Sequence, residues 1–370
     1  MKTKLHYVYA IAMLLVVFSS FAQNSSWKKI ESAENYKGLA KLELNKNDVQ
    51  LFKLDRSLFN RHTATVALRT SKKSSHKTII SLPGINGMEQ FEIYETPVFA
   101  PELAEKFPDI KSYIGFSLNN PGARLRMSTS PEGIQTMVSY LDQPSIFMQP
   151  LEHSSNTYVL YTRSDRNSFS QLDCKTVDEL SETLKNNNLS LKIDEGGANN
   201  QTLQKFRIAI SVTGEYTNYH GGTVANALAA INATLSRVNE IFETDMAVTF
   251  ELVANNNLIV YTNPGTDPYS DAVTGADGAW SNEVQSTLSS VIGAANYDIG
   301  HLFGATGGGG NAGCIGCVCN NSTIGRAFSS PSNGIPESDS FDLDFVAHEI
   351  GHQMGANHTW AFESEGTAVH

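Results

Sequence analysis

Five residues near the end of the sequence have the types and spacing of a hydrolytic metal site. His348, Glu349, His352, Gly355 and His358 form the pattern H-E-x-x-H-x-x-G-x-x-H. Because the first two histidines are four residues apart, a helix would place both imidazoles on one face, one turn apart. The glutamate would point elsewhere and could take a proton from a metal-bound water without binding the metal itself.

The third histidine completes a zinc site with one open position. Gly355 lies where a helix would end in a left-handed residue, and the chain can then return His358 to the metal. Three neutral histidines leave one tetrahedral position for water, whose pKa zinc lowers to about 7. We therefore expect Zn²⁺ bound by His348, His352 and His358, with Glu349 as the general base. The alternative is a buried amphipathic helix whose histidines are satisfied by neighbouring groups.

The residues before the motif predict a buried helix. Asp339 or Ser340 is a candidate N-cap, and Asp342 and Asp344 would put negative charge in the first turn. Apolar residues then recur on two stripes of this helix, which is typical of a helix buried in a domain interior.

This motif and the pattern upstream of it resemble the metzincin clan of zinc endopeptidases, most closely secreted bacterial proteases of reprolysin (adamalysin) type. The resemblance implies peptide-bond hydrolysis and a catalytic domain with a twisted, mostly parallel sheet. Two features depart from the family. Adamalysins typically have Asp after the third histidine, where this chain has Thr359, and the clan's Met-containing turn has no counterpart in residues 359–370. We therefore expect the catalytic domain to be truncated at its C-terminus; the alternative is a site that lacks this turn.

The N-terminus has the pattern of a secretory signal peptide. Lys2 and Lys4 precede an apolar run over residues 10–18, and Ser20-Phe21-Ala22 resembles a cleavage site. Residues 1–22 therefore predict secretion, with an N-terminal anchor as the alternative. The net charge of −11 and the absence of a basic run argue against nucleic acid and anionic membranes as partners.

The 370 residues predict an α+β chain of two domains. Residues 23–193 read as a β-rich propeptide, 194–204 as a polar linker, and 205–370 as a metzincin-like α/β catalytic domain. We expect a maturation cut between about Lys192 and Lys205. The expected propeptide strands are His62–Leu68, Thr78–Leu82, Gln90–Tyr94, Tyr113–Leu118, Ala123–Thr129, Gln135–Tyr140 and Tyr158–Tyr161. The passage Pro101–Tyr113 resembles the prodomains of secreted bacterial metalloproteases.

The catalytic region alternates between strand and helix patterns. The expected elements are a strand Phe206–Val212, a helix capped near Thr223, a strand from Met246 to Leu252 extended by Leu258–Tyr261, a helix Trp280–Ala294 and a strand Tyr297–Phe303. Gly307–Gly310 lacks the Lys-Ser/Thr of a phosphate-binding loop and reads as a flexible loop. The resemblance implies an edge strand that aligns substrate, and Gly316–Asn320 lies where that strand is expected.

Four cysteines allow several interpretations. For a secreted chain, Cys314, Cys317 and Cys319 favour structural disulfides over a second metal site. Cys174 stands alone before the linker and could be an inhibitory fourth zinc ligand, a disulfide partner or a free buried thiol. Asp298 matches a calcium-site position of some reprolysins, but the first strand supplies no second carboxylate, so we predict no calcium.

These observations predict a secreted zinc metalloendopeptidase, made as a zymogen, that acts on proteins or peptides. The alternatives are a non-catalytic extracellular binding or adhesion protein with structural zinc, and zinc hydrolysis of a non-peptide bond. Glu349 favours catalysis, because a structural site needs no general base beside its ligands. His62, His76 and His153 are scattered and read as surface or structural residues.

Overall fold

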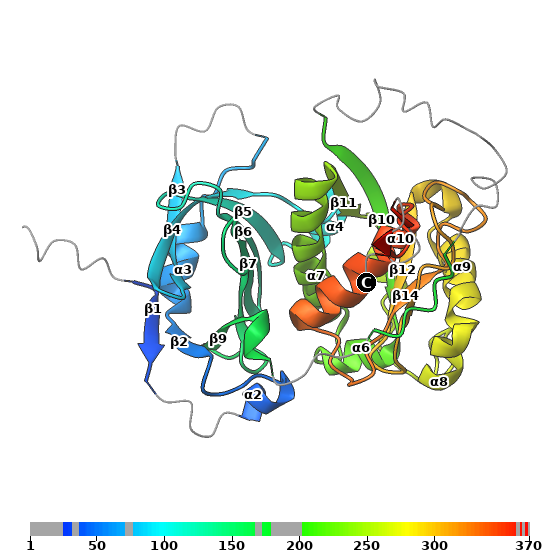
Figure 1. Ribbon diagram of the computed structural model, residues 1–370, viewed down its shortest axis with the longest axis horizontal. Coiled ribbons are helices and arrows are strands. Elements are labelled where there is room, and N and C mark those ends of the chain that lie inside the picture. The colour runs from blue at the N-terminus through cyan, green and yellow to red at the C-terminus, as the bar shows by residue number, and fades with distance from the viewer. Residues whose placement is uncertain are drawn as a thin grey trace, which may run out of the picture.

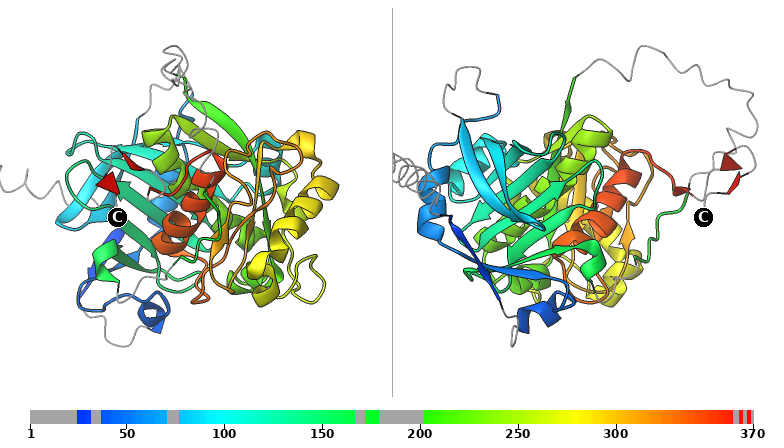
Figure 2. Two further views of the ribbon diagram at one scale, coloured as in Figure 1. Left: turned by 45° about the vertical axis from the view of Figure 1, so that its right-hand side comes forward. Right: turned by 60° about the vertical axis from the view of Figure 1, so that its left-hand side comes forward.

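The computed structural model describes residues 25–31, 37–70, 77–166, 172–178, 202–359, 363–364 and 367–368. The described residues 25–166 form an N-terminal module and residues 202–359 a C-terminal module, each built on one β-sheet. Helix α7 (Val224–Asp245) lies between the two sheets (Figure 1) and contacts strands of both; Figure 2 gives two further views of the chain. The predicted signal peptide and most of the predicted linker lie outside the described residues. No helix among the described residues is long and apolar enough to cross a membrane.

The sheet of the N-terminal module is antiparallel throughout, which confirms the β-rich first region. In spatial order its strands are β1 (Trp27–Ile30), β2 (Gln50–Leu54), β9 (Thr157–Thr162), β8 (Ile146–Pro150), β7 (Gly133–Ser139), β6 (Arg124–Ser130), β5 (Lys111–Ser117), β4 (Gly87–Glu95) and β3 (Thr78–Gly84). Its helices are α2 (Lys37–Lys41), α3 (Arg56–Thr63), α4 (Pro101–Lys106) and the 3₁₀ turn η1 (Arg163–Asp165).

Six of the seven expected strands are present, and one expectation was wrong. His62–Leu68 is not a strand, because helix α3 continues to Thr63. The Asp55 carboxylate caps that helix by accepting a hydrogen bond from the backbone N–H of Leu58, at 2.9 Å. Both faces of the sheet are apolar. Along β9, Tyr158 and Leu160 belong to one core cluster, whereas Val159 and Tyr161, which alternate with them, belong to another.

The sheet of the C-terminal module is mostly parallel, as predicted. Its strands, in spatial order, are β11 (Val248–Leu252), β10 (Gln204–Val212), β12 (Ile299–Phe303), β14 (Ala327–Ser329) and β13 (Gly310–Asn311), and only the last pair is antiparallel. Its helices are α6 (Gly214–Tyr219), α7, η2 (Asn256–Ile259), α8 (Ala272–Thr274), η3 (Gly275–Ala279), α9 (Trp280–Val291), η4 (Ala294–Asn296), η5 (Ser340–Ala347) and α10 (His348–Gln353). A small hairpin, β15 (Glu363–Ser364) and β16 (Thr367–Ala368), follows.

Local signals placed most of these elements correctly. The Thr223 hydroxyl accepts a hydrogen bond from the N–H of Asn226 and caps α7, as expected. Two strand expectations were wrong. Of Leu258–Tyr261, the first two residues end the 3₁₀ turn η2, and Val260 forms a single bridge to Val212. The edge strand is β13, whereas Gly316–Asn320 forms turns.

Helices cover both faces of this sheet. Helix α9 packs on one face, where Trp280, Val284 and Leu288 are buried with Phe328. Helices α7, η5 and α10 cover the other, where Phe341 joins the main core. The helix that carries the metal-site motif is therefore held against the sheet by an apolar face.

Residues before the linker cover both edges of the C-terminal sheet. At the β11 edge, the backbone N–H of Leu252 donates to the carbonyl of Val98 at 2.7 Å, and the N–H of Ala100 donates to the carbonyl of Leu252 at 2.9 Å. At the β13 edge, Cys174 pairs with Gly310 as a parallel bridge. Neither edge therefore offers a free run of backbone donors at these positions.

Candidate metal centre

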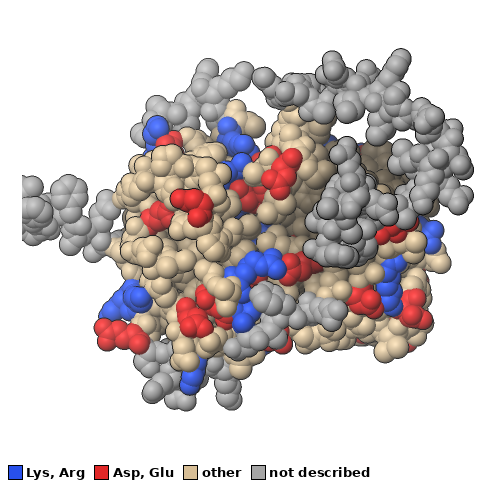
Figure 3. Space-filling view, viewed as in Figure 1, with Lys and Arg blue, Asp and Glu red and all other residues tan. Residues whose placement is uncertain are grey.

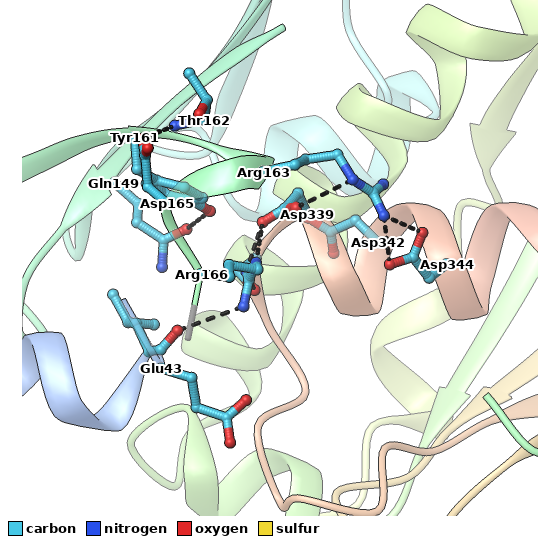
Figure 4. A network of polar contacts seen from close by, with 12 residues as sticks. Glu43, Gln149, Tyr161, Thr162, Arg163, Asp165, Arg166, Asp339, Asp342 and Asp344 are labelled. Carbon is cyan, nitrogen blue, oxygen red and sulfur yellow. Dashed lines mark hydrogen bonds and ion pairs between the residues drawn. The ribbon is translucent and has the colours of Figure 1, made fainter. Parts of the chain in front are cut away.

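The motif lies on an irregular helix. Residues Ser340–Ala347 wind as a wide π-helical stretch, η5, which continues into α10. The predicted cap is wrong: the Asp339 side chain makes no capping bond and instead accepts hydrogen bonds from Arg166, at 3.0 Å from Nε. The other two acids also bind arginines. Asp344 accepts from Arg163 at 2.7 Å (Figure 4) and Asp342 from Arg237 at 2.8 Å.

The donors predicted to bind the metal converge on one point. The Nε2 atom of His352 lies 3.0 Å from Nε2 of His348 and 3.2 Å from Nε2 of His358. The Sγ atom of Cys174 lies 3.6 Å from Nε2 of His352. One ligand atom from each of these four residues lies within 4.8 Å of the others.

These distances fit a tetrahedral zinc ion. Zn–N bonds of about 2.0–2.1 Å and a Zn–S bond of about 2.3 Å imply about 3.3 Å between nitrogens and about 3.6 Å between nitrogen and sulfur. The ring tautomers fit as well. Nδ1 of His352 donates to the carbonyl of Ala356 at 2.7 Å, and Nδ1 of His358 donates to Asp178 at 3.0 Å. Both Nε2 lone pairs therefore face the cluster.

The electrostatics of the histidines also suit metal binding. Burial, with the adjacent His352 and His358, lowers the pKa of His348 to about 4, and burial lowers the pKa of His352. Neutral imidazole is the form that binds a metal ion. Gly355 adopts φ +111°, as the sequence predicted, and the chain turns there to return His358.

Glu349 lies beside this cluster without joining it. Burial raises the pKa of its carboxyl to about 7. One carboxylate oxygen accepts a hydrogen bond from the Thr176 hydroxyl at 3.0 Å, and that hydroxyl in turn accepts from the N–H of Ala312 at 2.8 Å. A carboxyl with a pKa near neutrality can both accept and return a proton.

Residues 172–178, which we call the plug, lie across the candidate metal site as a segment with a single β-bridge, at Cys174. Cys174, Thr176 and Asp178 point inward, to His352, Glu349 and His358 respectively. The residues between them point away: the Lys175 ammonium donates to the carbonyl of Ala276 at 2.7 Å, and Val177 is 82% exposed. The period of two is that of a β-strand.

The plug also pairs with the edge strand through its backbone. The N–H of Lys175 donates to the carbonyl of Gly310 at 2.8 Å, and the N–H of Gly310 donates to the carbonyl of Asp173 at 3.1 Å. Burial, then the charge of Glu349, raises the pKa of the Cys174 thiol to about 12. A divalent cation would counter this shift, because it favours the thiolate.

The glycine run predicted to be a flexible loop has a steric role. Gly307, Gly308 and Gly309 all have positive φ, and Gly310 lies against the carboxylate of Glu349, the predicted base. A Cβ at Gly310 would lie 2.3 Å from a carboxylate oxygen of Glu349, and one at Gly309 would lie 2.4 Å from the carbonyl oxygen of Asp173. The run lets the edge strand approach both the base and the plug.

A buried polar chain anchors α10 to the sheet. Gln353 donates to the carbonyl of Gly300 at 2.9 Å and accepts from Nδ1 of His301 at 3.1 Å. Nε2 of His301 then accepts from the Ser329 hydroxyl at 2.9 Å. Burial lowers the pKa of His301 to about 4, so the ring is neutral at physiological pH.

The remaining candidate residues lie away from the metal centre. Cys314 and Cys317 form a disulfide, which confirms one structural pairing, while Cys319 is exposed. Asp298 accepts a hydrogen bond from Arg207 at 2.7 Å. Of the scattered histidines, His62 is exposed at the end of α3 and His153 is a surface residue near Glu132. His76 lies outside the described residues.

Sequence reasoning missed the inward residues Thr176 and Asp178, the Gln353–His301 anchor and the role of Gly310. The sequence carries little signal for the plug residues, because Thr176, Val177 and Asp178 alternate in polarity but the charged Lys175 interrupts the period of two.

The C-terminal module matches a known protein family. Residues 202–370 match the model of a family described as metallo-peptidase family M12B, reprolysin-like. A comparison with curated proteins finds no match. The family match and the His/Cys cluster confirm the reprolysin-like resemblance and zinc as the metal, with proteins or peptides as substrates.

Replacing Gly310 with alanine should displace the Glu349 carboxylate, because the added Cβ has no room. We expect kcat/KM for a peptide substrate to fall at least about tenfold, a loss of about 1.4 kcal/mol. Zinc content, measured by atomic absorption, should not change. Gly351→Ala is the matched control, since nothing lies within 4 Å of a Cβ at that α10 position. Full activity of Gly310→Ala would contradict the steric argument.

Proposed function

We propose that this chain, whose residues 202–370 form a reprolysin-like zinc metallopeptidase domain, is a secreted endopeptidase made as a latent precursor. Its metal ligands in this proposal are His348, His352 and His358, and its general base is Glu349. The observation that carries the proposal is a buried carboxyl of raised pKa beside three convergent imidazoles, at a sheet edge on which a peptide segment already lies. A purely structural zinc site has no use for that carboxyl.

The chemistry follows from the positions of these groups. When bound, the zinc ion would polarise the scissile carbonyl and acidify the attacking water. Glu349 accepts the proton of that water and later returns it to the leaving amine. The edge strand β13 offers the backbone groups of Gly310, which now bind the plug, to an extended substrate. Substrate and plug therefore compete for one strip of backbone.

Latency in this proposal comes from three inward contacts of the plug. The Cys174 sulfur would hold the zinc ion as a fourth ligand, the Thr176 hydroxyl donates a hydrogen bond to Glu349, and the Asp178 carboxylate accepts one from Nδ1 of His358. Withdrawing the plug frees the water position and the Glu349 carboxylate together. It also leaves His358 without the carboxylate that fixes its tautomer in the latent chain.

Secretion and processing complete the proposal. Residues 1–22 act as a signal peptide, residues 23–193 as a propeptide and residues 205–370 as the catalytic domain. The polar composition of the linker at 194–204 supports a maturation cut between about Lys192 and Lys205. N-terminal sequencing of the active form should therefore give a start within that window. A start well outside it would refute the boundary.

Glu349→Ala should remove the proton acceptor and leave the zinc ligands in place. We expect kcat/KM towards an unfolded protein to fall by about 10²–10⁴-fold, with unchanged zinc stoichiometry. A chelator should abolish the activity of the parent chain, and added zinc should restore it. Glu215→Ala, at an exposed acid on α6, is the control and should match the parent. Activity retained by Glu349→Ala would overturn the mechanism.

Cys174→Ala should raise the activity of the chain with its linker uncut, because it vacates the fourth ligand position. We expect an increase of at least about tenfold, corresponding to about 1.4 kcal/mol of lost inhibition. The control is Cys319→Ala, which removes an exposed thiol outside the site. Equal activity of the two uncut variants would show that Cys174 does not maintain latency.

A further inference from the structure

We propose that the N-terminal module is a permanent partner of the C-terminal module, and that activation withdraws the plug alone. After the linker is cut, residues 25–166 stay bound to the catalytic domain, and substrate reaches the metal centre within this complex. The activity that the complex should show rests on the proposed function. The association of the two modules does not rest on the proposed function.

The two modules share one hydrophobic core. Val98, Phe99, Leu103 and Ile110 of the N-terminal module are buried in the cluster that contains the apolar residues of α7, β10 and β11. From the other side, Leu343 of η5 packs against the second core cluster of the N-terminal module. An interface that continues the core of both partners is typical of obligate complexes.

Backbone pairing reinforces this contact at the β11 edge. The two hydrogen bonds between Leu252 and residues 98–100 form an isolated parallel bridge at the edge of the C-terminal sheet. Removing the N-terminal module would expose this edge together with the apolar side chains beneath it. Exposed apolar strand edges promote aggregation, so the C-terminal module gains by keeping its cover.

In the ion pairs that link the two parts of the chain, the cations come from the N-terminal side and the carboxylates from the C-terminal side. Several ion pairs link described residues before 179 to described residues after 201. In each of them, apart from the contact of His358 with Asp178, the cation is an Arg or Lys before 179 and the carboxylate lies after 201. Figure 3 shows such blue and red groups side by side along the junction of the modules. Arg126 lies 2.8 Å from Glu240 and 2.7 Å from Glu243, with all three side chains buried.

The C-terminal half of the sequence cannot replace these cations. Residues 205–370 contain 4 Lys and Arg against 17 Asp and Glu, whereas residues 1–204 contain 23 against 21. All four cations already have partners within the module: Lys205 with Glu251, Arg207 with Asp298, Arg237 with Asp342 and Arg326 with Asn282. Loss of the N-terminal module would therefore leave Glu240, Glu243 and Asp339 without a cation.

The plug lacks these attachments. Its backbone makes two hydrogen bonds to Gly310, and its inward side chains make only polar contacts to the metal centre. Of its outward residues, Lys175 reaches the carbonyl of Ala276 and the exposed Asp277, and Val177 lies in solvent. Only Leu172 among its residues packs against the shared core, and it is partly buried. The plug can therefore leave while the apolar and ionic interface stays intact.

The test cuts the linker of the full Cys174→Ala chain between residues 192 and 205 and follows both fragments by size-exclusion chromatography. Runs at about 0.15 M and about 1 M NaCl correspond to Debye lengths of about 8 and 3 Å. We expect the fragments to co-elute at both, because salt screens charges but does not weaken apolar contacts. Peptide hydrolysis should appear in the fractions that contain both fragments.

Two substitutions in the same cut chain compare how much a buried and an exposed ion pair contribute to the association of the fragments. Arg126→Gln should increase the separated fraction at least about tenfold, because it removes the buried cation that Glu240 and Glu243 share and leaves them only the more exposed Arg69 and Arg124. Arg163→Gln should change it less than about twofold, because the Arg163 side chain is 41% exposed. If Arg126→Gln does not fold, elution of the Cys174→Ala parent at the two salt concentrations still decides the question.

Separation of the fragments at about 0.15 M NaCl would overturn the proposal. Hydrolysis confined to fractions of the C-terminal fragment alone would also overturn it. Hydrolysis in no fraction would count against the proposed endopeptidase, while the elution profile would continue to decide the association.

Discussion

Three imidazole nitrogens and one sulfur lie so close together that a single cation could bind all four of them. The rest of the site serves this cluster. The hydrogen bonds from Nδ1 of His352 and His358 turn lone pairs towards it, and Gly355 allows the turn that closes it. The buried Glu349 gains its chemical use from the cation that the cluster would bind.

Residues of both modules hold the helix that carries this cluster in place. Within the C-terminal module, Gln353 anchors α10 to His301, and Arg237 balances Asp342. From the N-terminal module, Arg166 balances Asp339 at the start of η5. The plug adds the last contacts. The helix that carries the motif is thus held at its beginning by arginines and at its end by the sheet, which leaves its histidines little freedom to separate.

Features set by residues close together in the sequence were mostly predicted correctly, whereas contacts between residues far apart in the sequence were missed. The spacing of His348, Glu349 and His352 is local, and the structure brings these residues together with His358 and Cys174. The Thr223 cap and the alternating strands are local too. Asp339 was expected to cap a helix, but its partner lies 173 residues away. The edge strand was misplaced because one glycine, one asparagine and a tight fit against Glu349, rather than β-branched residues, define it.

The zinc coordination of the uncut chain tests the central claim most directly. X-ray absorption at the zinc edge of the full-length, zinc-loaded protein should show three nitrogen neighbours at about 2.0–2.1 Å and one sulfur at about 2.3 Å. Cys174→Ala should replace the sulfur with a nitrogen or oxygen neighbour and keep the three nitrogens. A first shell without sulfur in the parent protein, or one with fewer than three histidine nitrogens, would contradict this account of the site.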